Sequence, residues 1–163
     1  MQMRQMHNTV GFDRDLIQAY LTERGLKYLT DKDGDCVVIL ATEDMPHKLF
    51  TFFAAGGAQG KVFSIVAQVD PSPQMEEDEA LRLVNRWNDK RRWPRAIYRQ
   101  GNFVLDWHMD LEPGISPALF ADMCDTVIMA AHQFLSELSA PHGRTSRSEM
   151  LLRTLLAKLQ QKN

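Results

Sequence analysis

The chain has 163 residues, of which 44% are hydrophobic and 25% charged, which is the composition of one globular domain and not of a disordered segment. Its 19 basic and 21 acidic side chains leave a net charge of −2, which excludes the electrostatic character of a histone-like or ribosomal protein. Two cysteines are too few for a disulfide scaffold, and no apolar run approaches the roughly 20 residues of a membrane span. The polar N-terminus lacks the apolar core of a signal peptide. We therefore expect a soluble cytoplasmic protein.

The first half of the chain is predicted to form one helix followed by four short strands. The helix covers 13–24, where apolar residues recur on one face, and it ends at Gly25, a residue that tolerates positive φ. Asp33-Gly34 indicates a tight hairpin turn between the first two strands, because such turns require positive φ. The four strands are expected at 26–30, 36–41, 49–54 and 62–69.

The second half is predicted to form a helix, two strands and a long helix. The first helix ends near Asn88 and carries four acidic residues in its first turns, where the helix dipole favours negative charge. Strands follow at 95–99 and 103–111, and the second alternates apolar and polar residues, as an antiparallel strand with one solvated face does. The long helix begins at Ser116-Pro117, a capping residue followed by proline, and ends near Leu138.

This order of elements predicts an α+β fold, an antiparallel sheet with helices packed on one face. We expect the domain to span 10–138, followed by a linker over 139–148 and an amphipathic helix over 149–163, which opens with the capping box Ser146-x-x-Glu149. The leucines of this last helix are equally compatible with two arrangements. The helix either docks on its own domain or forms an interface with a partner or a second copy. These leucines are Leu152, Leu155, Leu156 and Leu159.

Charge is segregated along the chain, and the most basic block is 86–99, with six basic residues and one acidic residue. Candidate partner-binding residues in this block are Arg91, Arg92, Trp93 and Arg95. One hypothesis is a docking patch for an acidic partner or for nucleic acid, with aromatic rings that stack on bases. The other is a solvated loop whose aromatic residues lie in the core. We favour the second over nucleic-acid binding, because the chain as a whole is not basic.

The alternating strand places Asp106, His108 and Asp110 on one face, about 7 Å apart per step. This trio is compatible with a metal ion, or with a carboxylate that orients a histidine base, as in a metal-dependent hydrolase. The solvated side of a half-buried strand explains it more simply, since no metalloprotease, CxxC or nucleophile-elbow motif accompanies it. We therefore expect no catalytic site, no metal and no cofactor.

Two further motifs are rejected. Ala55–Lys61 resembles a phosphate-binding loop, but Ala55 stands where the motif requires its first glycine and Val62 where it requires serine or threonine. A strand also follows it, where phosphate binding requires a helix. Asp31, Asp33 and Asp35 begin like a calcium loop, but Cys36 stands where the sharp turn requires glycine.

The ordered set Leu83–Ala96 (LVNRWNDKRRWPRA), Gly101, Phe103–Leu105 and Gly114–Ser116 resembles the YbjN family, described as bacterial sensory transduction regulators. The resemblance covers 10–138. It implies a fold similar to type III secretion chaperones, with the order α-β-β-β-α-β-β-α, to which this chain adds one short strand and the last helix. It also implies a non-enzymatic, often dimeric protein that holds protein partners.

Within this resemblance Trp87 and Asn88 match signature positions of the family. We expect structural roles for both, with Trp87 closing the core and Asn88 capping its helix in left-handed geometry. The predicted function is a protein-binding regulator or chaperone-like adaptor, whose surface is one sheet face together with the loop 86–99. Nucleic-acid binding and, behind it, metal-dependent hydrolysis remain the alternatives.

Overall fold

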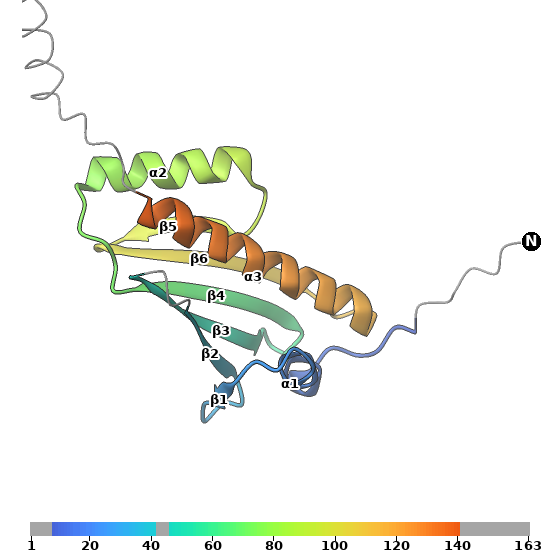
Figure 1. Cartoon of the computed structure of the whole chain (residues 1–163). Helices are drawn as coiled ribbons and strands as arrows, with labels where there is room; N and C mark the ends of the chain where they lie inside the picture. Colours follow the sequence, from blue (N-terminus) through green and yellow to red (C-terminus); the bar gives the residue numbers. More distant parts are fainter. Residues whose placement is uncertain (1–7, 42–45, 141–163) are drawn as a thin grey trace, which may run out of the picture.

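The computed structural model describes residues 8–41 and 46–140 (Figure 1). The predicted linker beyond residue 140 and the predicted helix 149–163 lie outside the described residues. The elements, in chain order, are α1 Arg14–Glu23, β1 Tyr28–Thr30, β2 Cys36–Leu40, β3 Lys48–Gly56, β4 Val62–Asp70, α2 Glu77–Lys90, β5 Arg95–Arg99, β6 Asn102–Asp110 and α3 Pro117–Ser139.

The six strands form one antiparallel sheet in the order β1-β2-β3-β4-β6-β5. Four consecutive hairpin-connected strands make up β1 to β4, and α2 then carries the chain across to the far edge, where β5 turns back into β6. The α+β prediction is confirmed, including the short first strand. The long pairing of β4 with β6 joins segments on either side of α2.

The ends of the helices agree with the local signals in the sequence. The Asp13 side chain accepts a hydrogen bond from the backbone N–H of Leu16 at 3.1 Å and begins α1. Gly25 ends it with φ of 66°, in the left-handed region. The Ser116 hydroxyl accepts from the N–H of Leu119 at 3.2 Å and begins α3, with proline at its first position.

All three helices pack on the same face of the sheet, which we call the helix-covered face (Figure 1). One cluster of buried side chains joins α1 and the first half of α3 to strands β2–β4. A second joins α2 and the second half of α3 to strands β3–β6. In the described residues the other face carries no helix, and we call it the open face.

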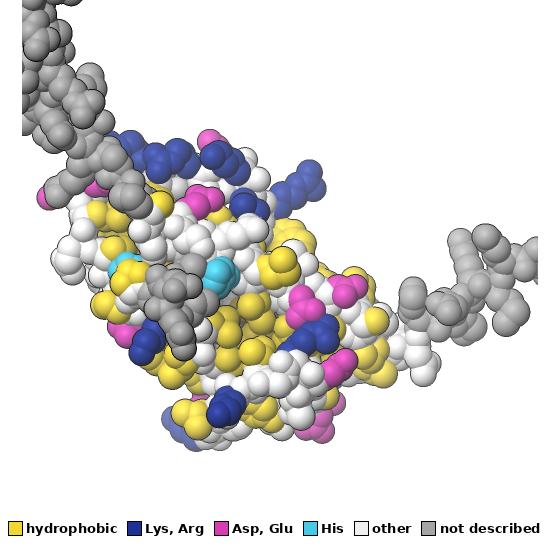
Figure 2. Space-filling model, in the orientation of Figure 1, with side chains coloured by type: hydrophobic (Ala, Val, Ile, Leu, Met, Phe, Trp, Pro, Cys, Tyr) yellow, Lys and Arg dark blue, Asp and Glu magenta, His cyan; other side chains and the backbone are white. Residues whose placement is uncertain are grey.

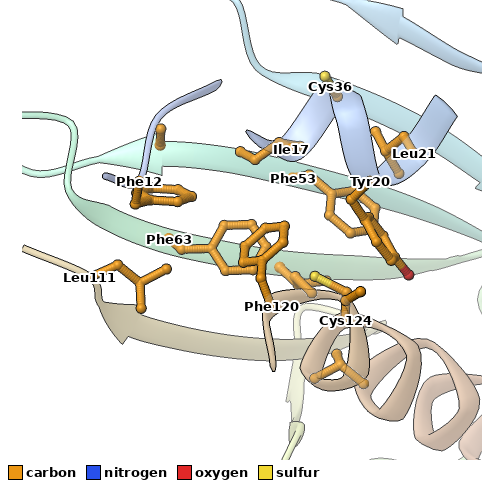
Figure 3. Close-up of a cluster of buried hydrophobic side chains, with 14 of the residues drawn as sticks. Phe12, Ile17, Tyr20, Leu21, Cys36, Phe53, Phe63, Leu111, Phe120 and Cys124 are labelled. Atoms are coloured by element: carbon orange, nitrogen blue, oxygen red, sulfur yellow. The ribbon is translucent and has the colours of Figure 1, made fainter. Parts of the chain in front are cut away.

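Aromatic rings fill the first cluster (Figure 3). The Phe63 ring from β4 lies at its centre, with its centroid 4.8 Å from that of Phe120 in α3 and 5.4 Å from that of Phe12. Phe53 of β3 and Tyr20 of α1 belong to the same cluster, and their ring centroids are 6.3 Å apart. Pairs at these separations stabilise a core beyond the area that they bury.

A polar junction ties α1 to α3 at the edge of this cluster. The Tyr20 hydroxyl donates to Asp125 Oδ1 at 2.8 Å, and Arg24 Nη2 donates to Asp125 Oδ2 at 2.7 Å. The hydrogen bond from Arg24 holds the pKa of the Asp125 carboxyl below its usual value; burial opposes this, and Tyr20 adds to it. Burial, reinforced by the hydrogen bond to Asp125, raises the pKa of Tyr20.

The expected role of Trp87 is confirmed, because its side chain is buried and its Nε1 donates to the Pro94 carbonyl at 3.0 Å. The expectation for Asn88 is wrong. Asn88 lies inside α2, which continues to Lys90, and Gln100 is the one non-glycine residue with positive φ among those described. The Asn88 side chain bonds to β5 instead.

Candidate protein-interaction surface

The open face is apolar over its first four strands. In an antiparallel sheet with one solvated face, the outward positions are usually polar. Here the outward positions of β2, β3 and β4 are mostly hydrophobic, and none of them belongs to either buried cluster. The apolar residues at these positions are Val37, Ile39, Phe50, Phe52, Ala54, Val62 and Val66.

The strand register arranges these side chains in rows across the sheet. Phe52 of β3 pairs with Val37 of β2 on one side and Val66 of β4 on the other, and Leu29 of β1 extends the row to the edge. Leu29 is 74% exposed, Ile39 53% and Phe52 40%. A contiguous exposed apolar patch of this kind is typical of a binding surface.

The β6 side of the open face is polar. Arg95 forms two hydrogen bonds to Asp106, at 3.1 Å from Nε to Oδ1 and 2.9 Å from Nη2 to Oδ2. His108 lies within 2.7 Å of the Ser64 hydroxyl through Nδ1 and 3.3 Å of Asp106 Oδ2 through Nε2. Burial raises the pKa of Asp106, but hydrogen bonds and charge from Arg95 and His108 outweigh it and leave the pKa lowered.

The trio Asp106, His108 and Asp110 does lie on one strand face, but its groups are already engaged. Arg95 donates hydrogen bonds to both oxygens of the Asp106 carboxylate. Asp110 Oδ1 accepts a hydrogen bond from the backbone N–H of Glu112 at 2.9 Å. Across residues 8–41 and 46–140, no three His, Cys, Asp or Glu side chains converge as metal ligands. These hydrogen bonds indicate that Asp106, His108 and Asp110 form a polar rim beside the apolar patch and do not form a metal site.

The structure brings together three of the four candidate residues of the basic loop. Arg91, Arg92 and Arg95 line one shallow depression of about 510 Å³ at the end of α2. Trp93 lies apart, packed against Trp107 with 5.8 Å between ring centroids and in contact with the first core cluster. Figure 2 shows further Lys and Arg side chains along α2, so the basic surface extends from the loop along this helix.

Each arginine of the depression has a different environment. The Arg91 guanidinium lies 4.7 Å from the centroid of the Trp87 ring, a cation–π contact. Arg95 points to the open face and pairs with Asp106. Arg92 is exposed and forms no salt bridge within the described part of the chain. Only Arg92 is therefore fully available to a partner without breaking an existing contact.

The two loops that resemble ligand-binding motifs are turns. Gly57–Lys61 connects β3 directly to β4. The Asp31 carboxylate accepts from the backbone N–H groups of Asp33 and Asp35, at 2.9 and 3.0 Å, which stabilises the β1–β2 hairpin. Asp35 in turn pairs with Arg14 at 3.0 Å.

Both cysteines are free and buried. Burial raises the pKa of the Cys124 thiol strongly and that of Cys36 as well, so neither forms a thiolate readily at neutral pH.

Sequence reasoning missed the apolar character of the open face over β1–β4. A signal was present: 49–55 reads LFTFFAA, in which Phe50 and Phe52 interrupt the alternation that a half-solvated strand requires. A strand that is apolar at every position except Thr51 is consistent with burial on both faces, and helices cover only one face in the described residues.

Comparisons with known proteins bear on the fold and the family. A family model described as "YbjN: Putative bacterial sensory transduction regulator" matches residues 13–140. A crystal structure described as "YbjN, a putative transcription regulator from E. coli" superposes with a TM-score of 0.60 at 12% sequence identity, over 82% of this chain and 96% of that chain. No curated protein matches the chain significantly. In the described residues, no helix has the length and apolar character needed to cross a membrane.

Proposed function

The chain belongs to the YbjN family, and from that premise we propose that it is a non-enzymatic, protein-binding regulator or adaptor of the cytoplasm. Its binding surface is the apolar part of the open face together with the basic loop, which lies beyond β6 at the β5 edge of the sheet. The observation that carries the proposal is the row of hydrophobic side chains around Phe52, exposed on a sheet face that no described helix covers.

The chemistry of this surface suits a protein partner better than a small molecule or nucleic acid. A sheet face of several strands is broad and flat, whereas small-molecule sites are concave and enclosed. Its centre is apolar and aromatic, with charged groups at its margin, which is the arrangement of a protein interface core and rim. A nucleic-acid site needs basic groups across the surface, and Arg95 on this face is already neutralised by Asp106.

The loop residues retain a role at the margin. Arg91 and Arg92 present positive charge at the end of α2, Arg95 pairs with Asp106 on the open face, and Trp93 supports the loop from within. We assign them to steering and orienting an acidic partner, because charges at a rim affect the rate of association more than its strength. The buried thiols and the engaged groups around His108 support a non-enzymatic role.

The test compares two substitutions at equally exposed hydrophobic residues. Phe52 on the open face and Leu81 on α2 are both 40% exposed. Tagged wild-type protein, Phe52→Glu and Leu81→Glu are used to capture partners from lysate of the native organism. We expect Phe52→Glu to lose the proteins that wild type retains, and Leu81→Glu to keep them.

Circular dichroism and unfolding curves of the three proteins check that each is folded. Equal capture by Phe52→Glu and wild type contradicts the assignment of the open face. Recovery of general chaperones alone, in all three cases, contradicts protein binding as the function.

A further inference from the structure

A second apolar surface lies on the helix-covered side, between α3 and the end of β2. It is a groove of about 270 Å³, which we call the α3–β2 groove, lined by Leu26, Ile39, Leu40, Ile128, His132 and Leu135 among others. Figure 2 shows hydrophobic side chains exposed on this side, between α3 and the first strands.

The groove exists because two elements stop short of it. β1 pairs with residues 36–38 of β2, and no other described strand pairs with the same side of the β2 backbone at Ile39 and Leu40. α1 ends at Glu23, and the chain passes Leu26 before β1 begins. Leu40 contacts both core clusters, so the groove lies at the junction between them, where a helix alongside α3 would complete the layer.

The sequence beyond the described residues contains a segment with matching features. Residues 149–163 carry leucines at 152, 155, 156 and 159, the spacing of one helical face. As a helix this segment is about 22 Å long. Its leucine stripe covers eight residues, 152–159, and the groove residues of α3, from Ile128 to Leu135, also cover eight. Each stripe is therefore about 10 Å long.

Chain connectivity brings the two together. Leu135 of the groove lies five residues before Ala140, the last described residue. The eight residues 141–148 are a normal length for a connection between antiparallel helices, and they reach up to about 26 Å. A helix that turned back along α3 on its groove side, at the usual 8–10 Å axial separation, would place its leucines over the groove.

From this match we propose that residues 149–163 form an amphipathic helix that docks its leucine stripe in the α3–β2 groove of the same chain. The inference goes beyond the proposed function, because the groove lies between α3 and the end of β2 and shares only Ile39 with the apolar residues named on the open face. The basic side chains of the segment, Arg153, Lys158 and Lys162, remain outward and solvated.

The test is disulfide formation in the full-length chain between Leu155→Cys and a second cysteine at one of three exposed positions. His132→Cys lies in the groove; Gln133→Cys lies on the same helix outside it; Phe52→Cys lies on the open face. The native Cys36 and Cys124 are buried and do not compete. After mild oxidation with oxidised glutathione, peptide mapping identifies the bond, and gel filtration separates bonds within a chain from bonds between chains.

We expect the His132→Cys pair to close within one chain about tenfold faster than either other pair, because docking raises the effective concentration of the two thiols. A bond between chains at this pair assigns the groove to a second copy and overturns the proposal. Faster closure with Phe52→Cys places the segment on the open face and also overturns it, as do equal rates for all three pairs. None of these outcomes depends on partner capture by the open face.

Discussion

Asn88 shows how one side chain completes the backbone of an edge strand. Its Nδ2 donates to the Ala96 carbonyl and its Oδ1 accepts from the Ala96 N–H, both at 2.9 Å. β5 is the last described strand of the sheet, so the outward backbone groups of Ala96 have no neighbouring strand among residues 8–41 and 46–140. The Asn88 amide takes the place of that strand, which both satisfies the groups and blocks the edge against pairing with another chain.

Asn88→Ala is expected to lower the free energy of unfolding by about 2 kcal/mol, because it leaves the N–H and carbonyl of a buried residue without partners. Urea unfolding at neutral pH measures the change. The matched control is Asp89→Ala, at the exposed next position of the same helix, which should change the free energy by about 0.5 kcal/mol or less. Equal effects of the two substitutions would show that the bridge contributes nothing.

At the scale of elements, the junction of α1 with α3 depends on a charged group. Asp125 accepts from both Tyr20 and Arg24, and its lowered pKa means that the folded state binds the proton less tightly than the unfolded state does. Its contribution to stability is therefore fully present above the ordinary pKa of 3.8 and is lost as the pH falls through the lowered value. The pKa of Asp106 at the β5–β6 hairpin is also lowered, so its contribution to stability is likewise lost as the pH falls.

The expected result is a free energy of unfolding that declines below about pH 4, and a shallower decline in Asp125→Asn. Urea unfolding between about pH 6 and about pH 3 gives the profile. Asp122→Asn, an exposed carboxyl on the same helix with no salt bridge among the described residues, serves as control and should follow wild type. If Asp125→Asn keeps the wild-type slope, the junction does not contribute to acid sensitivity.

For the whole molecule, the two-layer arrangement makes the faces of the sheet energetically unequal. Phe53 lies in the aromatic cluster under α1 and α3 and is fully buried, whereas its neighbour Phe52 lies on the open face and is 40% exposed. The two residues have the same chemistry, the same strand and adjacent backbone positions. A difference in the unfolding free energy lost on substituting each residue therefore reports how much the helix layer stabilises the face that it covers.

Phe53→Ala is expected to cost about 3 to 5 kcal/mol of unfolding free energy, since it opens a cavity in the core. Phe52→Ala should cost about 1 kcal/mol, because only part of its ring is buried by cross-strand neighbours. Thermal or urea unfolding of the two variants gives the comparison. Equal losses would indicate that both faces of the sheet are covered in solution.

Several elements were predictable because their signals are local. Ser116-Pro117 predicts the start of α3, Gly25 the end of α1, and Asp33-Gly34 the first hairpin, and each is confirmed. The position of Asn88 inside α2 was not predictable from the same reasoning. Its partner Ala96 becomes available only when β5 lies beside the helix, and that contact outweighs the preference of asparagine for a helix end.

For the candidate site, the sequence predicts which residue types are present but not which of them lie together. The number of arginines in 86–99 can be counted in the sequence, but their positions in space cannot. In the structure Arg91 lies over the Trp87 ring, whereas Arg95 lies on the open face and pairs with Asp106. Likewise, alternation placed Asp106 and His108 on one strand face, while the groups that engage them, from Arg95 and Ser64, come from neighbouring strands.

By itself the sequence determined the class of fold, the family, and nearly every helix and strand, because capping, turn chemistry and hydrophobic period act over a few residues. Tertiary structure alone decided which face of the sheet the helices cover and which apolar side chains remain outside. That choice depends on how α1, α2 and α3 pack together over strands far apart in the chain. A run such as 49–55 has hydrophobic residues for both faces, and only the packing of the helices shows which of them are left exposed.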